Sequence, residues 1–189
     1  MNSPLMIIFN VVVNFALLVI FLRFMFQFAH IDPHHPYAKA IYRLSAVVSV
    51  FRRIFPDLNK GQISLSAIVL MLLLTYIHIA GMASILSKPL DALTLFFAGT
   101  LKAILTFISA LKYIVFGAVI FSWVILLTNK IHPVMDIIMQ MAEPIIAPFR
   151  RITPSLGMID LSVLVALLAL SLLEICIEVV GKNILMMLH

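Results

Sequence analysis

The stretch FRRIFP at residues 51–56 recurs as FRRITP at residues 149–154, about a hundred residues further along the chain. Each copy is followed by a similar short segment, ISLS at 63–66 and IDLS at 159–162, and then by a long apolar run. A His-Pro pair precedes both copies. A period of this length indicates a duplicated module rather than a solenoid of short repeats. The sequence therefore predicts two copies of one structural unit.

The composition is that of an integral membrane protein. Apolar residues make up 63% of the 189 residues and charged residues only 11%, which is about half the charged share of soluble domains. A net charge of +5 would favour nucleic acid as a partner in a soluble protein. Here most basic residues lie between apolar runs, so we expect membrane topology and anionic lipid to explain the charge, and no nucleic acid partner.

Four apolar stretches approach or exceed the length of a membrane-spanning helix, at about residues 5–29, 63–86, 107–127 and 161–180. Two of them fall in each module, which we place at residues 1–94 and 95–189. The predicted fold is an all-α integral membrane protein with four transmembrane helices, arranged as two parallel-repeat hairpins with amphipathic cytoplasmic segments.

Residues 87–106, which join the two modules, allow two interpretations. Asp91, Thr94, Ala98 and Lys102 form a weakly polar stripe at steps of three or four residues. Either this segment is an amphipathic helix on the outer membrane surface, or the third span begins early as one long tilted helix. We favour the surface helix.

Basic residues predict the orientation of the chain in the membrane. The loop at residues 30–62 holds five Lys and Arg against two acidic residues, and the loop at 128–160 holds three Lys and Arg. The positive-inside rule places both loops in the cytoplasm and both termini outside, in the periplasm. Because each module then has an even number of spans, the two copies are parallel rather than inverted.

Both cytoplasmic loops contain amphipathic segments. In the first loop, apolar residues at helical spacing predict one interfacial helix; they are Tyr37, Ile41, Leu44, Val48, Phe51 and Phe55. In the second loop, Pro144 and Pro148 lack amide donors and must bend or restart the helix. Pro56 and Pro154 are predicted to end the two segments.

Ser64 and Asp160 hold equivalent positions just before the second span of each module. Both are good N-cap residues, because their side-chain oxygens accept hydrogen bonds from the first free amides of a helix. We expect each of them to cap the span that follows.

The second copy carries a family resemblance. EPIIAPFRRITP at residues 143–154, GMIDLS at 157–162 and the upstream Ser122-Trp123 pair resemble the signature of the YggT family. That family comprises small bacterial inner-membrane proteins related to the YlmG proteins of Gram-positive bacteria and chloroplasts. The resemblance covers essentially the whole chain in a two-repeat form. The first copy is degenerate, with Ser45, Ala46 and Val50 in place of Glu143, Pro144 and Pro148.

The resemblance implies a location, the bacterial inner membrane, more than an activity. Members of the family are loosely associated with osmotic response, with cell-division and cell-shape gene neighbourhoods, and in plastids with cytochrome assembly and nucleoid distribution. This implies a non-enzymatic protein that organises or assists assembly of membrane components. Anionic lipid and an unidentified membrane protein are the implied partners, and a homo-oligomer is left open. The alternative is a small ion or osmolyte transporter or channel linked to osmotic balance.

No arrangement of residues points to catalysis. The chain has no nucleophile elbow, no phosphate-cradling glycine loop and no Cys and His spacing typical of zinc sites. We therefore expect neither an enzyme nor a cofactor.

Arg52, Arg53, Arg150 and Arg151 are the candidate contacts to lipid or to a partner protein. Each pair lies where an amphipathic segment meets a proline turn. Guanidinium groups suit lipid phosphates, and each basic residue near an anionic surface contributes about 1 kcal/mol. The alternative is that these arginines only determine topology, as basic loop residues do in any membrane protein.

Three ionisable residues, His78, Lys112 and Glu174, are expected deep within the spans. Such residues are functional candidates because an isolated charge inside the bilayer is costly. Glu174 lies 14 residues after Asp160, and His78 lies 14 residues after Ser64. We predict a Lys112–Glu174 ion pair that His78 is able to join. The alternative is that Lys112 snorkels to the outer surface.

This intramembrane polar cluster has two interpretations. A titratable His and Glu beside a Lys suit a proton or ion pathway, but they also suit polar contacts that fix the packing of two modules. We favour packing, because four spans leave little room for a pathway. We also expect Arg23 to snorkel to the cytoplasm and Asn10 to make an interhelical hydrogen bond.

Overall fold

The computed structural model describes residues 4–58, 63–87, 90–153 and 160–187. These residues form an all-α protein, as predicted, and within them four helices are long and apolar enough to cross a membrane. They are α1 (Pro4–Phe28), α4 (Leu65–Ile85), α5 (Ala92–Thr128) and α7 (Leu161–Met187). Pro154 and the start of the GMIDLS segment lie outside the described residues.

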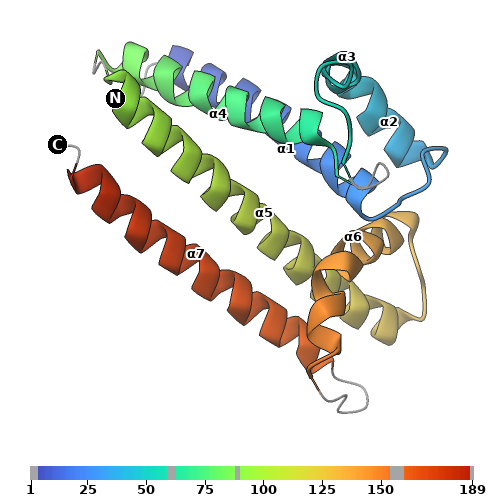
Figure 1. Cartoon of the computed structure of the whole chain (residues 1–189). Coiled ribbons are helices and arrows are strands. Elements are labelled where there is room, and N and C mark those ends of the chain that lie inside the picture. Colours follow the sequence, from blue (N-terminus) through green and yellow to red (C-terminus); the bar gives the residue numbers. More distant parts are fainter. Residues whose placement is uncertain (1–3, 59–62, 88–89, 154–159, 188–189) are drawn as a thin grey trace.

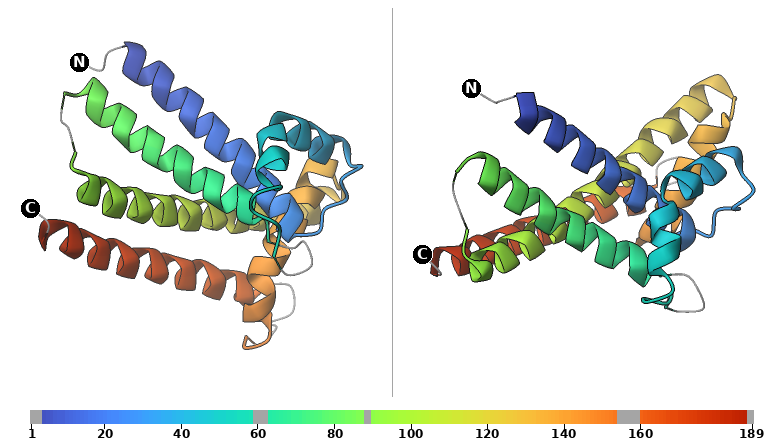
Figure 2. Two further views of the ribbon diagram at one scale, coloured as in Figure 1. Left: turned by 45° about the horizontal axis from the view of Figure 1, so that its top comes forward. Right: turned by 90° about the horizontal axis from the view of Figure 1, so that it is seen from above.

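Three shorter helices gather at one end of the long ones (Figure 1). They are α2 (Pro36–Leu44), α3 (Ala46–Phe51) and α6 (Pro133–Arg150). The start of α1, the end of α4, the start of α5 and the end of α7 lie at the opposite end, as two views of the fold agree (Figures 1 and 2). The two basic loops therefore share one end of the molecule, as two parallel hairpins require.

The preference for a surface helix at residues 87–106 is wrong. From Ala92 onward, the segment belongs to α5, a single helix of 37 residues. Asp91 caps it by accepting hydrogen bonds from the amides of Leu93 and Thr94 at 3.1 and 3.0 Å. The polar residues in its first turns face α4 rather than water, since the Thr100 hydroxyl lies 2.8 Å from that of Tyr76. At about 55 Å, α5 exceeds the hydrocarbon thickness and must tilt or protrude.

The α5 helix is the centre of the fold, because it packs against α4, α6 and α7, whereas α1 packs against α4 and α2. Within the described residues, close approach needs glycine at two of the contacts made by α5. A Cβ on Gly99 of α5 would lie 2.2 Å from the Tyr76 ring, and a Cβ on Gly181 of α7 would lie 2.3 Å from Leu101. Small residues of this kind let membrane helices pack where apolar burial gives little driving force.

The best-packed part of the core lies where α1 and α5 approach the short helices. The Phe107 ring makes edge-to-face contacts with Phe21 and Phe24, with centroids 5.6 and 5.5 Å apart. Met25 of α1 and Met141 of α6, with 0% and 2% of their surface exposed, belong to the same buried cluster. At the end with the two basic loops, the two modules therefore pack against each other through one shared core.

The first loop differs from the prediction of one interfacial helix. The chain forms two short helices, and Ser45 between them leaves the helical conformation with φ −98° and ψ 29°. In the second loop, α6 continues through Pro144 and Pro148 and changes direction along its length (Figure 1). The prolines therefore bend this helix without restarting it.

The predicted helix caps differ between the modules. Asp160 caps α7 by accepting a hydrogen bond from the Ser162 amide at 2.9 Å. Ser64 occupies the N-cap position of α4 but makes no capping bond, because its hydroxyl pairs with that of Ser66 at 3.1 Å. The cap prediction is confirmed for Asp160 and wrong for the side chain of Ser64.

Candidate functional site

The predicted ion pair between Lys112 of α5 and Glu174 of α7 is present, with a distance of 2.5 Å between Nζ and Oε2. The Ser109 hydroxyl donates to the other carboxylate oxygen of Glu174. The two charged side chains are 30% and 20% exposed. Lys112 thus neutralises Glu174 instead of reaching toward the end of the bundle.

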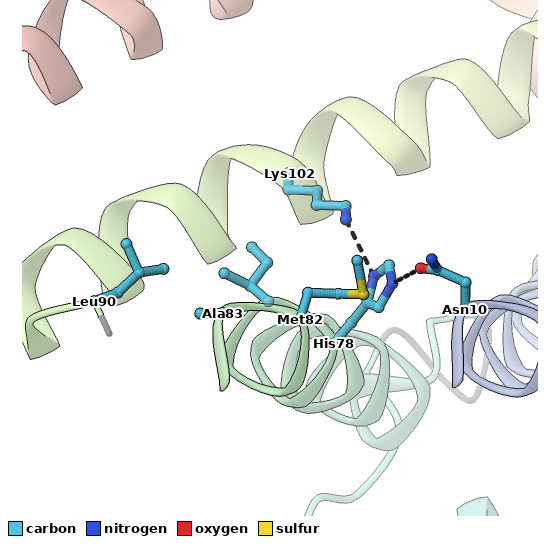
Figure 3. A pocket seen from close by; sticks show the side chains of 7 residues that line it. Asn10, His78, Met82, Ala83, Leu90 and Lys102 are labelled. Carbon is cyan, nitrogen blue, oxygen red and sulfur yellow. Dashed lines mark hydrogen bonds between the residues drawn. The ribbon is translucent and has the colours of Figure 1, made fainter. Parts of the chain in front are cut away.

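His78 does not join this pair, so that part of the prediction is wrong. Its Nε2 lies 2.5 Å from the Oδ1 atom of Asn10 in α1, and its Nδ1 lies 3.1 Å from Nζ of Lys102 in α5. In Figure 3, Asn10 and Lys102 approach two different edges of the imidazole. The interhelical hydrogen bond expected for Asn10 is confirmed. The three residues form a second polar cluster that joins α1, α4 and α5.

The two polar clusters hold equivalent positions in the two modules. Asn10 lies 20 residues before His30, and Ser109 lies 20 residues before Asn129. His30 and Asn129 are the left-handed residues that follow the first long helix of each module, with φ of 55° and 50°. His78 and Glu174 are already equivalent by sequence spacing. Each module therefore carries one polar contact between its two long helices, completed by a lysine of α5.

The Lys102 contact was missed by the sequence analysis. The predicted surface helix at residues 87–106 included Lys102, and a lysine on a solvent-facing helix needs no partner. A signal was available, because Lys102 and Lys112 are both on one apolar segment and ten residues apart. Only the continuity of α5 places both lysines on one membrane-spanning helix.

In each Arg-Arg pair, the first arginine forms ion pairs within the protein. Arg52 lies 2.9 Å from Asp57, whose side chain is 6% exposed. Arg150 of α6 lies 2.5 Å from Glu143 and 3.0 Å from Asp160, and so ties α6 to the start of α7. Although burial raises the pKa of Asp160, hydrogen bonds from Ser162 and Arg150 hold that pKa below its ordinary value. Arg52 and Arg150 are therefore largely engaged in fixing the loops.

The second arginine of each pair is available for other contacts. Arg53 and Arg151 are exposed, and within the residues that the structure describes neither forms an ion pair. Each precedes an exposed isoleucine, with Ile54 69% and Ile152 73% exposed. An arginine beside an exposed apolar side chain is typical of a surface that meets the boundary between headgroups and acyl chains.

Arg23 does not snorkel to the solvent, contrary to expectation. It is 6% exposed, and its guanidinium turns into the junction of α2 and α3. One terminal nitrogen donates to the Ser45 carbonyl at 2.8 Å, and the other donates to the Ser49 hydroxyl at 3.2 Å. The guanidinium carbon also lies 5.0 Å from the centre of the Tyr42 ring. Buried carbonyls at the break between the helices provide a better site than the bilayer edge.

A groove with a cavity volume of about 680 Å³ opens between α5, α6 and α7. Its walls include Ser122 and Trp123, which lie seven and six residues before Asn129, as Arg23 and Phe24 do before His30. Phe24 is 6% exposed, whereas Trp123 is 68% exposed. The second module is therefore open at a place where the first module is filled.

Metal-binding geometry is not found in the part of the chain that the structure describes, where no three His, Cys, Asp or Glu side chains gather as a metal site requires. Cys176 of α7 is exposed and is not in a disulfide. The candidate site residues described above are thus held by ion pairs and hydrogen bonds, beside exposed apolar surface.

Comparison with known proteins supports the duplication of the chain. A family model described as CCB3/YggT matches the chain twice, at residues 2–85 and 97–180. An uncharacterized protein of Pseudomonas aeruginosa is 26% identical over 180 residues, covering 94% of this chain and 89% of its own. The uncharacterized protein YggT of Escherichia coli K12 is 25% identical over 89% of this chain and 86% of its own. An uncharacterized protein of Haemophilus influenzae is 31% identical over 86% and 85%. No solved structure matches.

Proposed function

Because this chain belongs to the CCB3/YggT family, we propose that it is a non-enzymatic protein of the bacterial inner membrane that organises or assists assembly of membrane components. It does so by binding anionic lipid and a membrane protein partner at the end that carries α2, α3 and α6. That end lies in the cytoplasm and the termini lie in the periplasm, as the basic loops favour. The multi-pass character itself rests on four apolar helices.

The observation that carries this proposal is the pairing pattern of the arginines. Arg52 and Arg150 are held by carboxylates of the protein, whereas Arg53 and Arg151 are exposed beside exposed isoleucines. Two modules thus present the same Arg-Ile pair from one end of the bundle. Guanidinium groups at this level fit lipid phosphates or the carboxylates of a partner.

The long helices add a second argument. Of the described residues of α7, only Ser162 and Ala166 are buried, so most of this helix faces outward. Polar contacts hold α7 to α5, while its outer face offers apolar surface to lipid chains or to helices of another protein. An exposed apolar face of this length is suited to contact with a partner, including a second copy.

The test is recovery of partners after cross-linking in native membranes, with mass spectrometry of the retained proteins and lipids. Replacing Arg53 and Arg151 with alanine is expected to remove a stoichiometric membrane protein and to reduce retained anionic lipid. Two lost phosphate contacts correspond to about 2 kcal/mol, or roughly thirtyfold in affinity.

The matched control is the double substitution Arg43→Ala and Lys130→Ala, which also removes one exposed basic residue from each loop. This control is expected to retain the partner, and cysteine labelling checks that both variants keep their orientation. Equal retention by both variants, or a reversed orientation of the Arg53/Arg151 variant alone, would refute the proposed contact.

A second candidate function is transport of a small ion or osmolyte during osmotic stress. The observation that favours it is the presence of two lysine-centred polar clusters along α5, at Lys102 and Lys112. Against it, the charged groups around Glu174 satisfy one another, as residues that fix helix packing do.

For transport, the measurement is ion and osmolyte release from proteoliposomes under osmotic downshift. We expect no faster release than from empty liposomes, because Lys112 and Ser109 already occupy both oxygens of Glu174. Release that depends on the protein and is abolished by Glu174→Gln, with insertion intact, would replace the organising role by transport.

A further inference from the structure

We infer that Lys102, His78 and Asn10 form a binding site for a phosphate group (Figure 3). The site lies toward the end of the bundle opposite the short helices α2, α3 and α6. The site is separate from the arginine surfaces of the proposed function, which lie at the opposite end.

The hydrogen bonds leave the charge of Lys102 without compensation. An ammonium group only donates, so the Nδ1 atom of His78, 3.1 Å away, accepts from Lys102. The His78 proton is then on Nε2, which donates to the Asn10 carbonyl oxygen at 2.5 Å. The imidazole is neutral in this arrangement. Across residues 4–58, 63–87, 90–153 and 160–187, no carboxylate forms an ion pair with Lys102.

The equivalent cluster in the second module contains a carboxylate that neutralises its lysine, and the first cluster has none. There Glu174 occupies the position of His78 and neutralises Lys112 at 2.5 Å. In the first module a neutral ring stands in place of the carboxylate, while a lysine is still present on an apolar helix. An uncompensated charge on a membrane-spanning helix, such as that of Lys102, is costly in free energy. An anion from outside the chain would complete the first cluster as Glu174 completes the second.

The space for this anion is a pocket of about 320 Å³ beside Lys102. The pocket lies between α1, α4 and the start of α5, with apolar walls that include Met82 and Leu90. Lys102 keeps two further N–H donors and the Asn10 amide group has two, which suits an acceptor with several oxygens such as phosphate.

Two sources can supply the phosphate group, a phospholipid headgroup or free phosphate. Lys102 lies about 15 Å from the start of α5, and its flexible stem brings the ammonium group closer to the headgroups. The apolar walls also suit the carbon part of a lipid. The experiment therefore has one arm for each source.

In the first arm, the full chain in an uncharged detergent is titrated with inorganic phosphate. In the second arm, it is placed in phosphatidylcholine nanodiscs with increasing phosphatidylglycerol. The readout is the ¹H–¹⁵N signal of the His78 ring, assigned by its absence from a His78→Glu variant. We expect a saturable shift in at least one arm, and the responding arm identifies the source. A Lys102→Met variant is expected to bind about tenfold more weakly or not at all.

Two further variants keep the test decisive if Lys102→Met folds poorly. His78→Glu supplies an internal carboxylate, so by native mass spectrometry it is expected to retain one anionic ligand fewer than the unmodified chain, with no loss of stability. Lys182→Met removes a basic residue near the same end that is already paired with Glu178, and it is expected to bind normally. Absence of a saturable shift in both arms, or equal ligand retention by the unmodified, His78→Glu and Lys182→Met proteins, would overturn the inference.

Discussion

Replacing Glu174 with leucine while Lys112 is retained is expected to lower the free energy of unfolding by about 3 kcal/mol. The substitution leaves an ammonium group on an apolar helix without its counter-charge, and it removes the acceptor of the Ser109 hydroxyl. The protein contains a single tryptophan, Trp123, whose fluorescence can follow unfolding by sodium dodecyl sulfate in lipid–detergent micelles.

The matched control is the double substitution Lys112→Leu and Glu174→Leu. Removing both charges together leaves no unpaired group, so this variant is expected to lie within about 1 kcal/mol of the unmodified protein. A single substitution no more harmful than the double one would show that the pair contributes no coupling between α5 and α7. In that case Lys112 finds another partner when Glu174 is absent.

Replacing Arg23 with methionine is expected to cost about 3 kcal/mol and to loosen the loop that contains α2 and α3. Methionine fills similar space but leaves the Ser45 carbonyl and the Ser49 hydroxyl without their charged donor. Hydrogen bonds to charged groups contribute about 1.5–3 kcal/mol each, and buried groups left unpaired carry a further penalty. Hydrogen exchange of residues 36–51, together with the unfolding titration, measures both effects.

Two comparisons make the Arg23 result specific. Arg23→Lys keeps the charge but cannot bond Ser45 and Ser49 from two separate nitrogens, so it is expected to recover only part of the stability. Ser122→Ala changes the equivalent position of the second module, which lines an open groove, and is expected to change stability by less than about 0.5 kcal/mol. Unchanged exchange in Arg23→Met would contradict the role of Arg23 in holding α2 and α3.

For the interior polar residues, sequence spacing predicts depth in the bundle but only some of the partners. The 14-residue spacing from Ser64 and Asp160 places His78 and Glu174 at equivalent depths, and one lysine at a similar depth predicted the ion pair of Glu174. The same spacing did not reveal the partners of His78, because they come from two other helices, α1 and α5. Which lysine faces which helix depends on the rotation and contact of α5, and sequence spacing does not fix these.

The arginines show the same division. Their repetition marked both loops as a pair, and their type pointed to phosphates and carboxylates. The pattern gave all four equal weight, since adjacent residues cannot be distinguished without the fold. Only the positions of Asp57, Glu143 and Asp160 separate Arg52 and Arg150, which hold the loops, from the exposed Arg53 and Arg151.

The sequence by itself determined the family, the membrane character, the four spans and the duplication. These follow from composition and from patterns along the chain, which need no knowledge of distant contacts. The tertiary structure decided that α5 is one long helix, that Arg23 is buried at a helix break, and that the two modules differ at equivalent places. A polar stripe looks the same whether it faces water or another helix. Its meaning is set by which helix packs against it, because burial and pairing arise only when distant segments meet.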